Sequence, residues 1–185
     1  MPKPSQHTTM LTLATLLSLT APVGADPWPT ITIPEVNAAR QRTAPTRPPP
    51  GDVAERSRVL FDALNGGSIE TAQRFFLPLE PFLAIKDMHG ARGYHARLLR
   101  EYARDIAAYR ETLPRGQTLS FVRFVPSSTC VWMSVGREAN RLPYYSCYGS
   151  RLVVRAGRRE IALRVNVLIH WGDQWYVTHL DRIHR

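Results

Sequence analysis

His179 and Asp181 are the two side chains whose types and spacing best suit chemistry. They lie two residues apart in a β-rich stretch, and alternate residues of a strand share one face. A carboxylate beside an imidazole fixes the tautomer and raises the pKa of the ring, as a general base requires. A lone histidine on an apolar face is more often a hydrogen-bonded core residue, so the catalytic and the packing interpretation both stay open.

Three further residues are candidates for binding a ligand. Glu138 and Asn140 belong to a polar loop between two expected strands, where they would rim a pocket or form a solvated turn. Tyr94 opens an expected long helix, where it would contact a ligand or pack in the core. These residues would act by binding rather than by catalysis.

No sequence pattern indicates a metal or a cofactor. The histidines have no partner at H-x-x-x-H or H-E-x-x-H spacing, and the chain has no Cys/His cluster. It also lacks a glycine-rich phosphate loop and a G-x-S-x-G nucleophile elbow. We therefore predict neither a metal site nor a bound cofactor.

The N-terminus has the features of a secretory signal peptide. An apolar run over 10–19 is too short for a stable membrane anchor, and Val23 and Ala25 supply the small residues that precede a cleavage site. We predict a signal peptide over 1–25, cleaved after Ala25, which leaves no transmembrane anchor. The mature protein would be periplasmic or extracellular.

Cys130 and Cys147 are the only cysteines of the chain. An even pair in an oxidising compartment predicts a structural disulfide. The alternatives are two buried free thiols or a redox pair, although no C-x-x-C motif supports a redox pair. If the flanking strands form a hairpin, the two residues lie about equally far from its middle, close enough for a bridge.

Arginine carries the positive charge of the chain. Lys and Arg number 24 against 15 Asp and Glu, and only Lys3 and Lys86 are lysines. Export makes a nucleic acid an unexpected partner, whereas anionic envelope components or an acidic protein would fit. On the expected long helix, Glu101 is spaced to pair with Arg97 and Arg104.

The elements that must position these residues can be predicted from hydrophobic periodicity. Residues 26–51 are rich in proline and arginine and predict an extended, disordered arm. A single domain should follow over 52–185, with helices over 52–64, 68–76 and 94–113. Strands are expected over 119–125, 129–135, 144–154, 160–171 and 175–180. This order predicts an α+β fold with three helices on one face of an antiparallel sheet of four to six strands.

The last two strands should form a hairpin around Gly172 and Asp173. A three-residue loop would place His179 opposite Val167 on the core face, and a two-residue loop would place it opposite Asn166 on the polar face. Leu168, Tyr176 and Leu180 are expected on the outer face, where they would support a homodimer; a monomer is equally compatible.

This pattern resembles the NTF2-like superfamily. The final Gly-Asp-Gln-Trp-Tyr-Val-Thr-His-Leu over 172–180 and the opening Phe-Asp-Ala-Leu-Asn-Gly-Gly-Ser over 61–68 carry the resemblance, which covers about 52–181. It implies an NTF2-like or cystatin-like cone, with a pocket between the helices and a curved sheet. The superfamily contains isomerases and dehydratases as well as binding domains, so the fold does not decide the function. Asp181 stands where several relatives carry a second histidine.

Three functions follow, and the first is favoured because no complete acid–base set can be assigned. The first is a non-catalytic exported domain that binds a small ligand or a partner protein. The second is a cofactor-independent isomerase or dehydratase that uses His179 and Asp181 with a tyrosine donor. The third is an arginine-rich module that binds anionic polymers of the envelope.

Overall fold

The computed structural model describes residue 44 and residues 46–180. All of them belong to one compact unit, Ile31–Arg185. The predicted signal peptide, most of the predicted arm and Asp181 lie outside the described residues, so what was expected of them stays a prediction. Every helix in the described part of the chain is too short or too polar to cross a bilayer.

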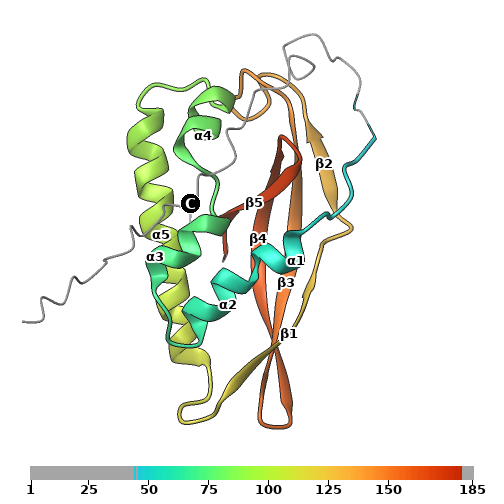
Figure 1. Ribbon diagram of the computed structural model, residues 1–185. Helices are drawn as coiled ribbons and strands as arrows, with labels where there is room; N and C mark the ends of the chain where they lie inside the picture. The colour runs from blue at the N-terminus through green and yellow to red at the C-terminus, as the bar shows by residue number, and fades with distance from the viewer. Residues whose placement is uncertain (1–43, 45, 181–185) are drawn as a thin grey trace, which may run out of the picture. The chain divides into compact units, whose positions relative to one another are not determined.

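Helices come first in the described chain, and Figure 1 shows them packed beside a long sheet. Their bounds are α1 Val53–Arg56, α2 Arg58–Leu64, α3 Ile69–Ala72 with a 3-10 turn at Gln73–Phe75, α4 Leu79–Ile85 and α5 Ala91–Thr112. The predicted helix over 52–64 is interrupted at Ser57, so the prediction of three helices was wrong. The Ser57 hydroxyl donates to Ala54 O at 2.7 Å, and this local bond competes with continuation of the helix.

The helix α4 was not among the predicted helices, and it follows one proline and contains another, although proline usually breaks a helix. Pro78 is the residue that precedes the helix, and Pro81 lies in its first turn. Backbone N–H groups of the first turn have no partner within a helix, so proline is tolerated there. The two prolines therefore mark the beginning of a helix rather than the end of one.

The sheet has five antiparallel strands: β1 Leu119–Val125, β2 Cys130–Met133, β3 Tyr144–Ala156, β4 Arg159–Trp171 and β5 Gln174–His179. Its order is β1-β3-β4-β5, and β2 also pairs with β3. The two halves of the long strand β3 have different partners, since 144–147 pairs with β2 and 151–156 with β1. The predicted α+β class and the antiparallel sheet are thereby confirmed.

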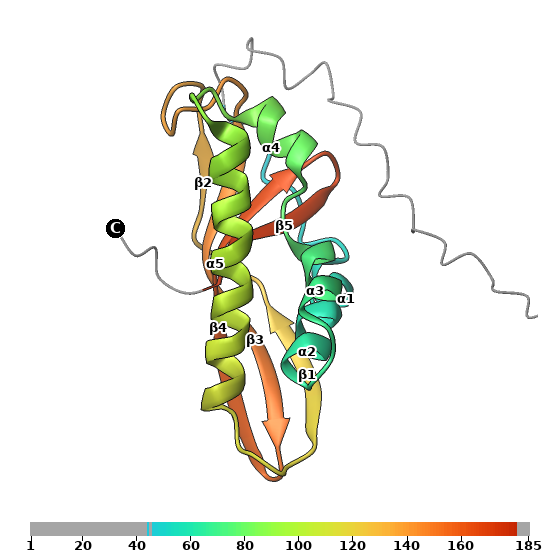
Figure 2. The same cartoon turned by 90° about the vertical axis from the view of Figure 1, so that its left-hand side faces the viewer.

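Aromatic side chains join the helices to the sheet. Phe75 lies edge-on to Phe124 of β1, with ring centroids 6.1 Å apart, and Phe76 lies 5.2 Å from Tyr102 of α5. Leu77 N donates to Val177 O at 3.0 Å, which fixes this segment beside β5. In Figure 2, α5 runs lengthwise in front of the sheet, while α1, α2 and α3 stand together to one side.

The register of the last hairpin combines features of both predicted alternatives. The turn has two residues, because Trp171 pairs with Gln174. A bulge follows, in which Leu168 pairs with Val177 but Val167 pairs with His179. The extra residue of β5 thus restores the Val167–His179 pairing that a three-residue loop would have produced.

The predicted outer face of this hairpin is not a free surface. Leu168 is 2% exposed, and both Tyr176 and Leu180 are fully buried. These residues were expected to be exposed, and that expectation was wrong, so they do not support a homodimer. The choice between a monomer and a homodimer stays a prediction. The chain before α1 packs against this region, since Trp175 Nε1 donates to Pro49 O at 2.9 Å.

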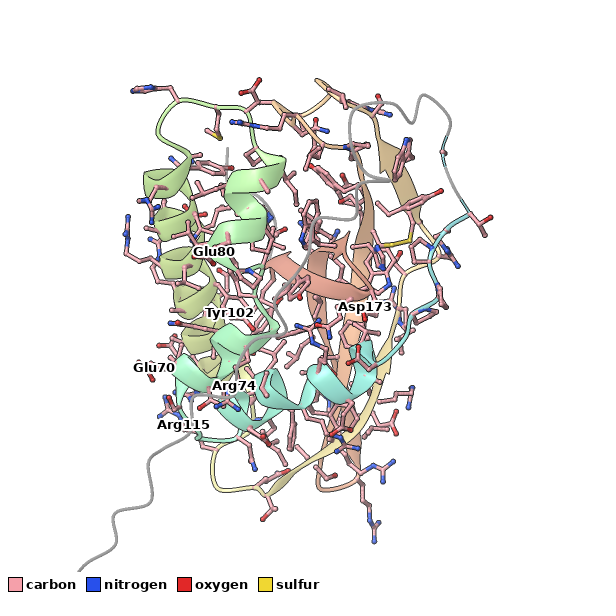
Figure 3. All side chains as sticks on the ribbon, turned by 45° about the horizontal axis from the view of Figure 1, so that its top comes forward. Glu70, Arg74, Glu80, Tyr102, Arg115 and Asp173 are labelled. Carbon is pink, nitrogen blue, oxygen red and sulfur yellow. A yellow bond between two sulfur atoms is a disulfide. The ribbon has the colours of Figure 1, made fainter. Side chains whose placement is uncertain are left out.

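The disulfide between Cys130 and Cys147 is present as predicted. The two residues are direct partners in the pairing of β2 with β3, and their Cα atoms are 4.0 Å apart. Figure 3 shows the bond in yellow between these strands. It links the short edge strand β2 covalently to the middle of the sheet.

Candidate functional site

The predicted site residue Glu138 belongs to a closed network with Lys86 and Tyr144. Lys86 Nζ donates to Glu138 O and to the Tyr144 hydroxyl, both at 3.1 Å. The Tyr144 hydroxyl donates in turn to Glu138 Oε2 at 2.7 Å. Burial lowers the pKa of Lys86 and raises that of Tyr144, and it is the largest cause of both shifts. The charges of Lys86 and Glu138 compensate each other.

Asn140 has a structural role in the same loop. It is 2% exposed, and its amide nitrogen donates to Ser134 O at 3.1 Å and to Leu142 O at 2.9 Å. Its Oδ1 accepts the Glu138 backbone N–H at 2.9 Å. The side chain is thus hydrogen-bonded within the loop and holds the backbone of Glu138 in place.

Tyr94 and His179 lie around this network. Tyr94 stacks on Phe82 with ring centroids 6.0 Å apart, and the Arg97 guanidinium lies over its ring. His179 Nδ1 is 3.1 Å from Thr178 Oγ1. Burial lowers the pKa of His179, and the nearby charges of Glu101 and Glu138 partly oppose this. The imidazole is therefore neutral at pH 7.

The fold thus gathers Tyr94, Glu138 and His179 around Lys86 and Tyr144, which the sequence did not single out. One signal could have pointed to Lys86, because it is the only lysine of the chain beyond Lys3. Lys86, Glu138 and Tyr144 are hydrogen-bonded to one another. This arrangement fastens the loop before β3 to the end of α4.

A cavity of about 290 Å³ lies elsewhere, beside the disulfide. Its lining comes from the chain before α1, from α1 itself, from the link between β1 and β2, and from strands β2 to β5. The lining residues are Arg47, Pro48, Pro50, Val53, Pro126, Ser127, Ser128, Cys130, Cys147, Ser150, Leu168 and Trp175. Apolar groups predominate, and Arg47 is the one charged residue among them.

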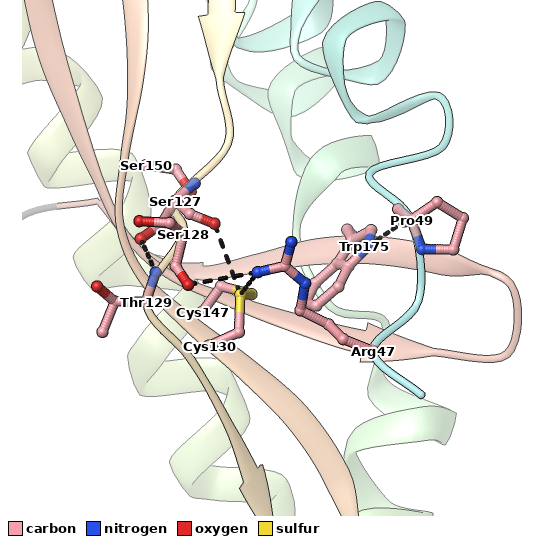
Figure 4. The surroundings of a disulfide bond; sticks show 9 residues. All are labelled: Arg47, Pro49, Ser127, Ser128, Thr129, Cys130, Cys147, Ser150 and Trp175. Carbon is pink, nitrogen blue, oxygen red and sulfur yellow. Dashed lines mark hydrogen bonds between the residues drawn. A yellow bond between two sulfur atoms is a disulfide. The ribbon is translucent and has the colours of Figure 1, made fainter. Parts of the chain in front are cut away.

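The walls of this cavity are held by specific hydrogen bonds, which Figure 4 shows. Arg47 Nη1 donates to Ser128 O at 3.3 Å and lies 3.7 Å from Cys130 Sγ. Ser127 N donates to Ser150 Oγ of β3 at 3.0 Å. The described end of the predicted arm, residues 46–50, therefore contributes to the cavity.

Next to Trp175, His170 makes the stability of the fold depend on pH. Its ring lies edge-on to Trp175, with centroids 4.9 Å apart, and burial lowers its pKa to about 4. Between pH 6.5 and 4 the unfolded chain binds a proton at His170 that the folded chain does not bind. The stability of the folded protein is therefore not reduced by His170 above pH 6.5. It falls as the pH is lowered from 6.5 to about 4, because protonation of His170 favours the unfolded chain.

The unfolding free energy of the wild-type protein should decrease between pH 7 and pH 4. We predict that this decrease is smaller in His170→Gln by about 1–2 kcal/mol, a value lowered to account for the partial exposure of the ring. Urea denaturation at a series of pH values measures this decrease. His89→Gln changes an exposed histidine and serves as the control. An equal pH dependence in wild type and His170→Gln would contradict the prediction.

Among residues 46–180, no group of three or more His, Cys, Asp or Glu side chains could hold a metal ion. The groups available to a ligand or substrate are the imidazole of His179, the ion pair of Lys86 with Glu138, and a small cavity with one cation, Arg47. Comparison with known proteins found no matching family model, no matching curated protein and no matching solved structure.

Proposed function

We propose that the protein is an exported, non-catalytic domain of NTF2-like architecture that binds a small molecule with an apolar body and a carboxylate. The cavity beside the disulfide is the binding site. The observation that carries the proposal is its lining, in which a single guanidinium, that of Arg47, stands among apolar side chains and serine hydroxyls.

The size and composition of the cavity support a small ligand. Its volume of about 290 Å³ is at the lower end of the range for small-molecule sites. Val53, Leu168 and Trp175 would cover an apolar body, and burial of such a body is the main driving force for binding. A carboxylate would accept charge-assisted hydrogen bonds from Arg47.

The absence of an acid–base pair in the lining favours binding over catalysis. The lining contains neither carboxylates nor histidines. The His179 ring is hydrogen-bonded to the Thr178 hydroxyl, while Glu138 is paired with Lys86 and Tyr144, and Glu101 with Arg97 and Arg104. The alternative enzyme would need Asp181, which lies outside the described residues.

Two features support the proposed location and architecture. The disulfide is compatible with an oxidising compartment, as the sequence pattern of a signal peptide also suggests. The NTF2-like proposal rests on the sequence resemblance, together with helices that precede and cover an antiparallel sheet.

Isothermal titration calorimetry with benzoate and the straight-chain acids from butanoate to decanoate tests the binding site. We expect at least one acid to bind, and its neutral amide to bind at least tenfold more weakly, which corresponds to about 1.4 kcal/mol. In Arg47→Gln the acid and its amide should bind equally, because the variant lacks the cation that distinguishes them.

A matched pair of variants locates the site. Ser128 lines the cavity and Thr129 does not, although both are exposed. Ser128→Phe should therefore abolish binding of the acid, while Thr129→Phe should leave it unchanged. The proposal fails if none of the acids binds to the wild-type protein, or if the two variants behave alike.

A further inference from the structure

The hairpin of β3 and β4 has an unusual excess of positive charge. Its segment 151–164 contains one acidic residue, Glu160, and five arginines: Arg151, Arg155, Arg158, Arg159 and Arg164. All five arginines are exposed. The excess amounts to four charges, because five cations oppose one carboxylate. Figure 1 shows the turn of this hairpin at the end of the sheet, beyond the helices.

The strand register places most of these arginines on one face of the sheet. Arg151 is the direct partner of Arg164, and Arg155 is the direct partner of Glu160. Arg123 of β1 is opposite Val153, which lies between Arg151 and Arg155 on the same side of β3. Arg123, Arg151, Arg155 and Arg164 therefore share one face, which we call the arginine face.

The opposite face of the hairpin is the one that the helices cover. Leu152 and Val154 point to that side and are fully buried. Their partners Phe124 and Phe121 on β1 contact Phe75 and Phe61 of the helical segment. The arginine face is consequently directed away from the core, where a large partner could reach it.

The charges on the arginine face are only partly compensated. Glu160 pairs with Arg123 at 3.1 Å and with Arg155 at 2.9 Å, so one carboxylate serves two guanidinium groups. No carboxylate in the described chain pairs with Arg151 or Arg164, although these two arginines are directly opposed. Like charges in this position destabilise a sheet, so their presence is not explained by stability.

The arginine side chains also cover the sheet. Val153 is 4% exposed, yet it does not belong to the hydrophobic core cluster. Long arginine stems bury apolar surface while their guanidinium groups stay in water. A flat layer of cations thus lies along the hairpin. At the turn, Arg158 and Arg159 add two more exposed cations, but Arg159 is the partner of Ala156 and lies on the opposite side of the hairpin.

We propose that the arginine face binds a linear, phosphate-rich polyanion that lies along the hairpin. Guanidinium groups match the oxygens of phosphate in a bidentate geometry, and a phosphate polymer has a dense row of charges. Arg151 and Arg155 are four residues apart on one strand, which spaces their Cα atoms about 13 Å. A polymer can therefore contact several arginines at once.

A bilayer is the less suitable partner of the same charge. Among the described residues, the exposed large apolar side chains are Val125 and Val135. Neither lies at the turn of the hairpin, where Gly157 and Arg158 stand between the strands. The end of the hairpin has no large apolar side chain to insert, whereas insertion is a main source of interfacial membrane affinity.

Fluorescence anisotropy of end-labelled long-chain inorganic polyphosphate, measured over a series of KCl concentrations, tests the proposal. We expect the affinity of the wild-type protein to fall steeply with salt, because bound counterions are released. The double variant Arg151→Gln with Arg164→Gln should bind at least tenfold more weakly. The slope of its log affinity against log salt concentration should be shallower by about one to two.

A second double variant controls for the loss of net charge. Arg97→Gln with Arg104→Gln also removes two cations, but from the exposed face of α5, where both arginines share Glu101. We expect its affinity for polyphosphate to stay within twofold of wild type. The thermal midpoint of the hairpin variant should be unchanged or higher, because two opposed like charges are removed, so a folding defect would not account for lost binding.

Three results would overturn the proposal. The first is an equal loss of affinity in the two double variants, which would indicate unspecific attraction by net charge. The second is failure of the wild-type protein to bind polyphosphate at low salt. The third is binding to phosphatidylglycerol vesicles but not to polyphosphate, which would make a membrane the partner. Carboxylate binding in the cavity is a separate site and should be unaffected in the hairpin variant.

Discussion

Replacement of both cysteines, Cys130→Ala with Cys147→Ala, is expected to lower the free energy of unfolding by about 3 kcal/mol. The disulfide closes a loop with a sequence separation of 17, and the chain-entropy model assigns this value to such a loop. A domain is typically stable by about 5–15 kcal/mol, so the loss is substantial. Urea denaturation measures it directly, and the thermal midpoint should fall by roughly 10 °C.

The same experiment contains its own control. A reductant should destabilise the wild-type protein to about the level of the double alanine variant, and it should leave that variant unchanged. If the wild-type protein has the same thermal midpoint with and without reductant, the bridge contributes nothing and the expectation is contradicted.

The substitution Arg56→Met should cost about 2–3 kcal/mol of unfolding free energy. Arg56 ends α1 and donates to Trp175 O and, at 3.2 Å, to Arg74 O. Its guanidinium also lies 4.3 Å from the ring centroid of Tyr176. Burial is the main cause that lowers the pKa of this group. Its removal would leave two carbonyl groups without their donors and would end a cation–π contact.

Arg58→Met is the matched control for this variant. Arg58 lies two residues on, pairs with Glu55 at 2.8 Å and covers the ring of Phe121, but it is exposed. Its loss should cost less than about 1 kcal/mol, as is typical of exposed ion pairs. The cost of Arg56→Lys in unfolding free energy should lie between those of Arg56→Met and Arg58→Met, because lysine keeps the charge but lacks the planar guanidinium. Equal midpoints in urea for the variants at 56 and 58 would refute the role given to Arg56.

The strands were predictable because their hydrophobic pattern has a period of two. The predicted limits 119–125 agree with β1, and the disulfide followed from an even pair of cysteines and hairpin symmetry. The ion pairs of Glu101 with Arg97 and Arg104 were likewise predicted from helical spacing. Each of these inferences depends on neighbours in the sequence.

The register of the last hairpin was not predictable, because it depends on the fold as a whole. The sequence left two loop lengths open, and the structure has the shorter turn with a bulge that returns Val167 opposite His179. Burial of Leu168 also depends on distant chain, since Trp175 of the same hairpin is hydrogen-bonded to Pro49. Periodicity within one hairpin contains no information on such contacts.

The candidate sites were only partly predictable for the same reason. Glu138 was singled out as a polar loop residue, but its partners Lys86 and Tyr144 come from the end of α4 and from β3. Asn140 looked like a ligand contact, whereas the structure uses its amide within the loop. The cavity joins Arg47 to Leu168 and Trp175, more than a hundred residues away, so only the folded chain reveals it.

The order of the strands has a consequence for how the chain folds during synthesis. Every strand pairing in the sheet is antiparallel and joins a strand to the next strand or the next but one along the chain, so β1 to β5 can assemble as soon as they have been made. The helical segment is translated first, yet Leu77 must bond to Val177 and Phe75 must meet Phe124. Phe75 can meet Phe124 once β1 has been made, but Leu77 lacks its hydrogen-bond acceptor until β5, the last strand, is complete. The side of the helical segment that packs against β5 therefore stays uncovered until the end of synthesis, and in this interval the nascent chain is most exposed to aggregation.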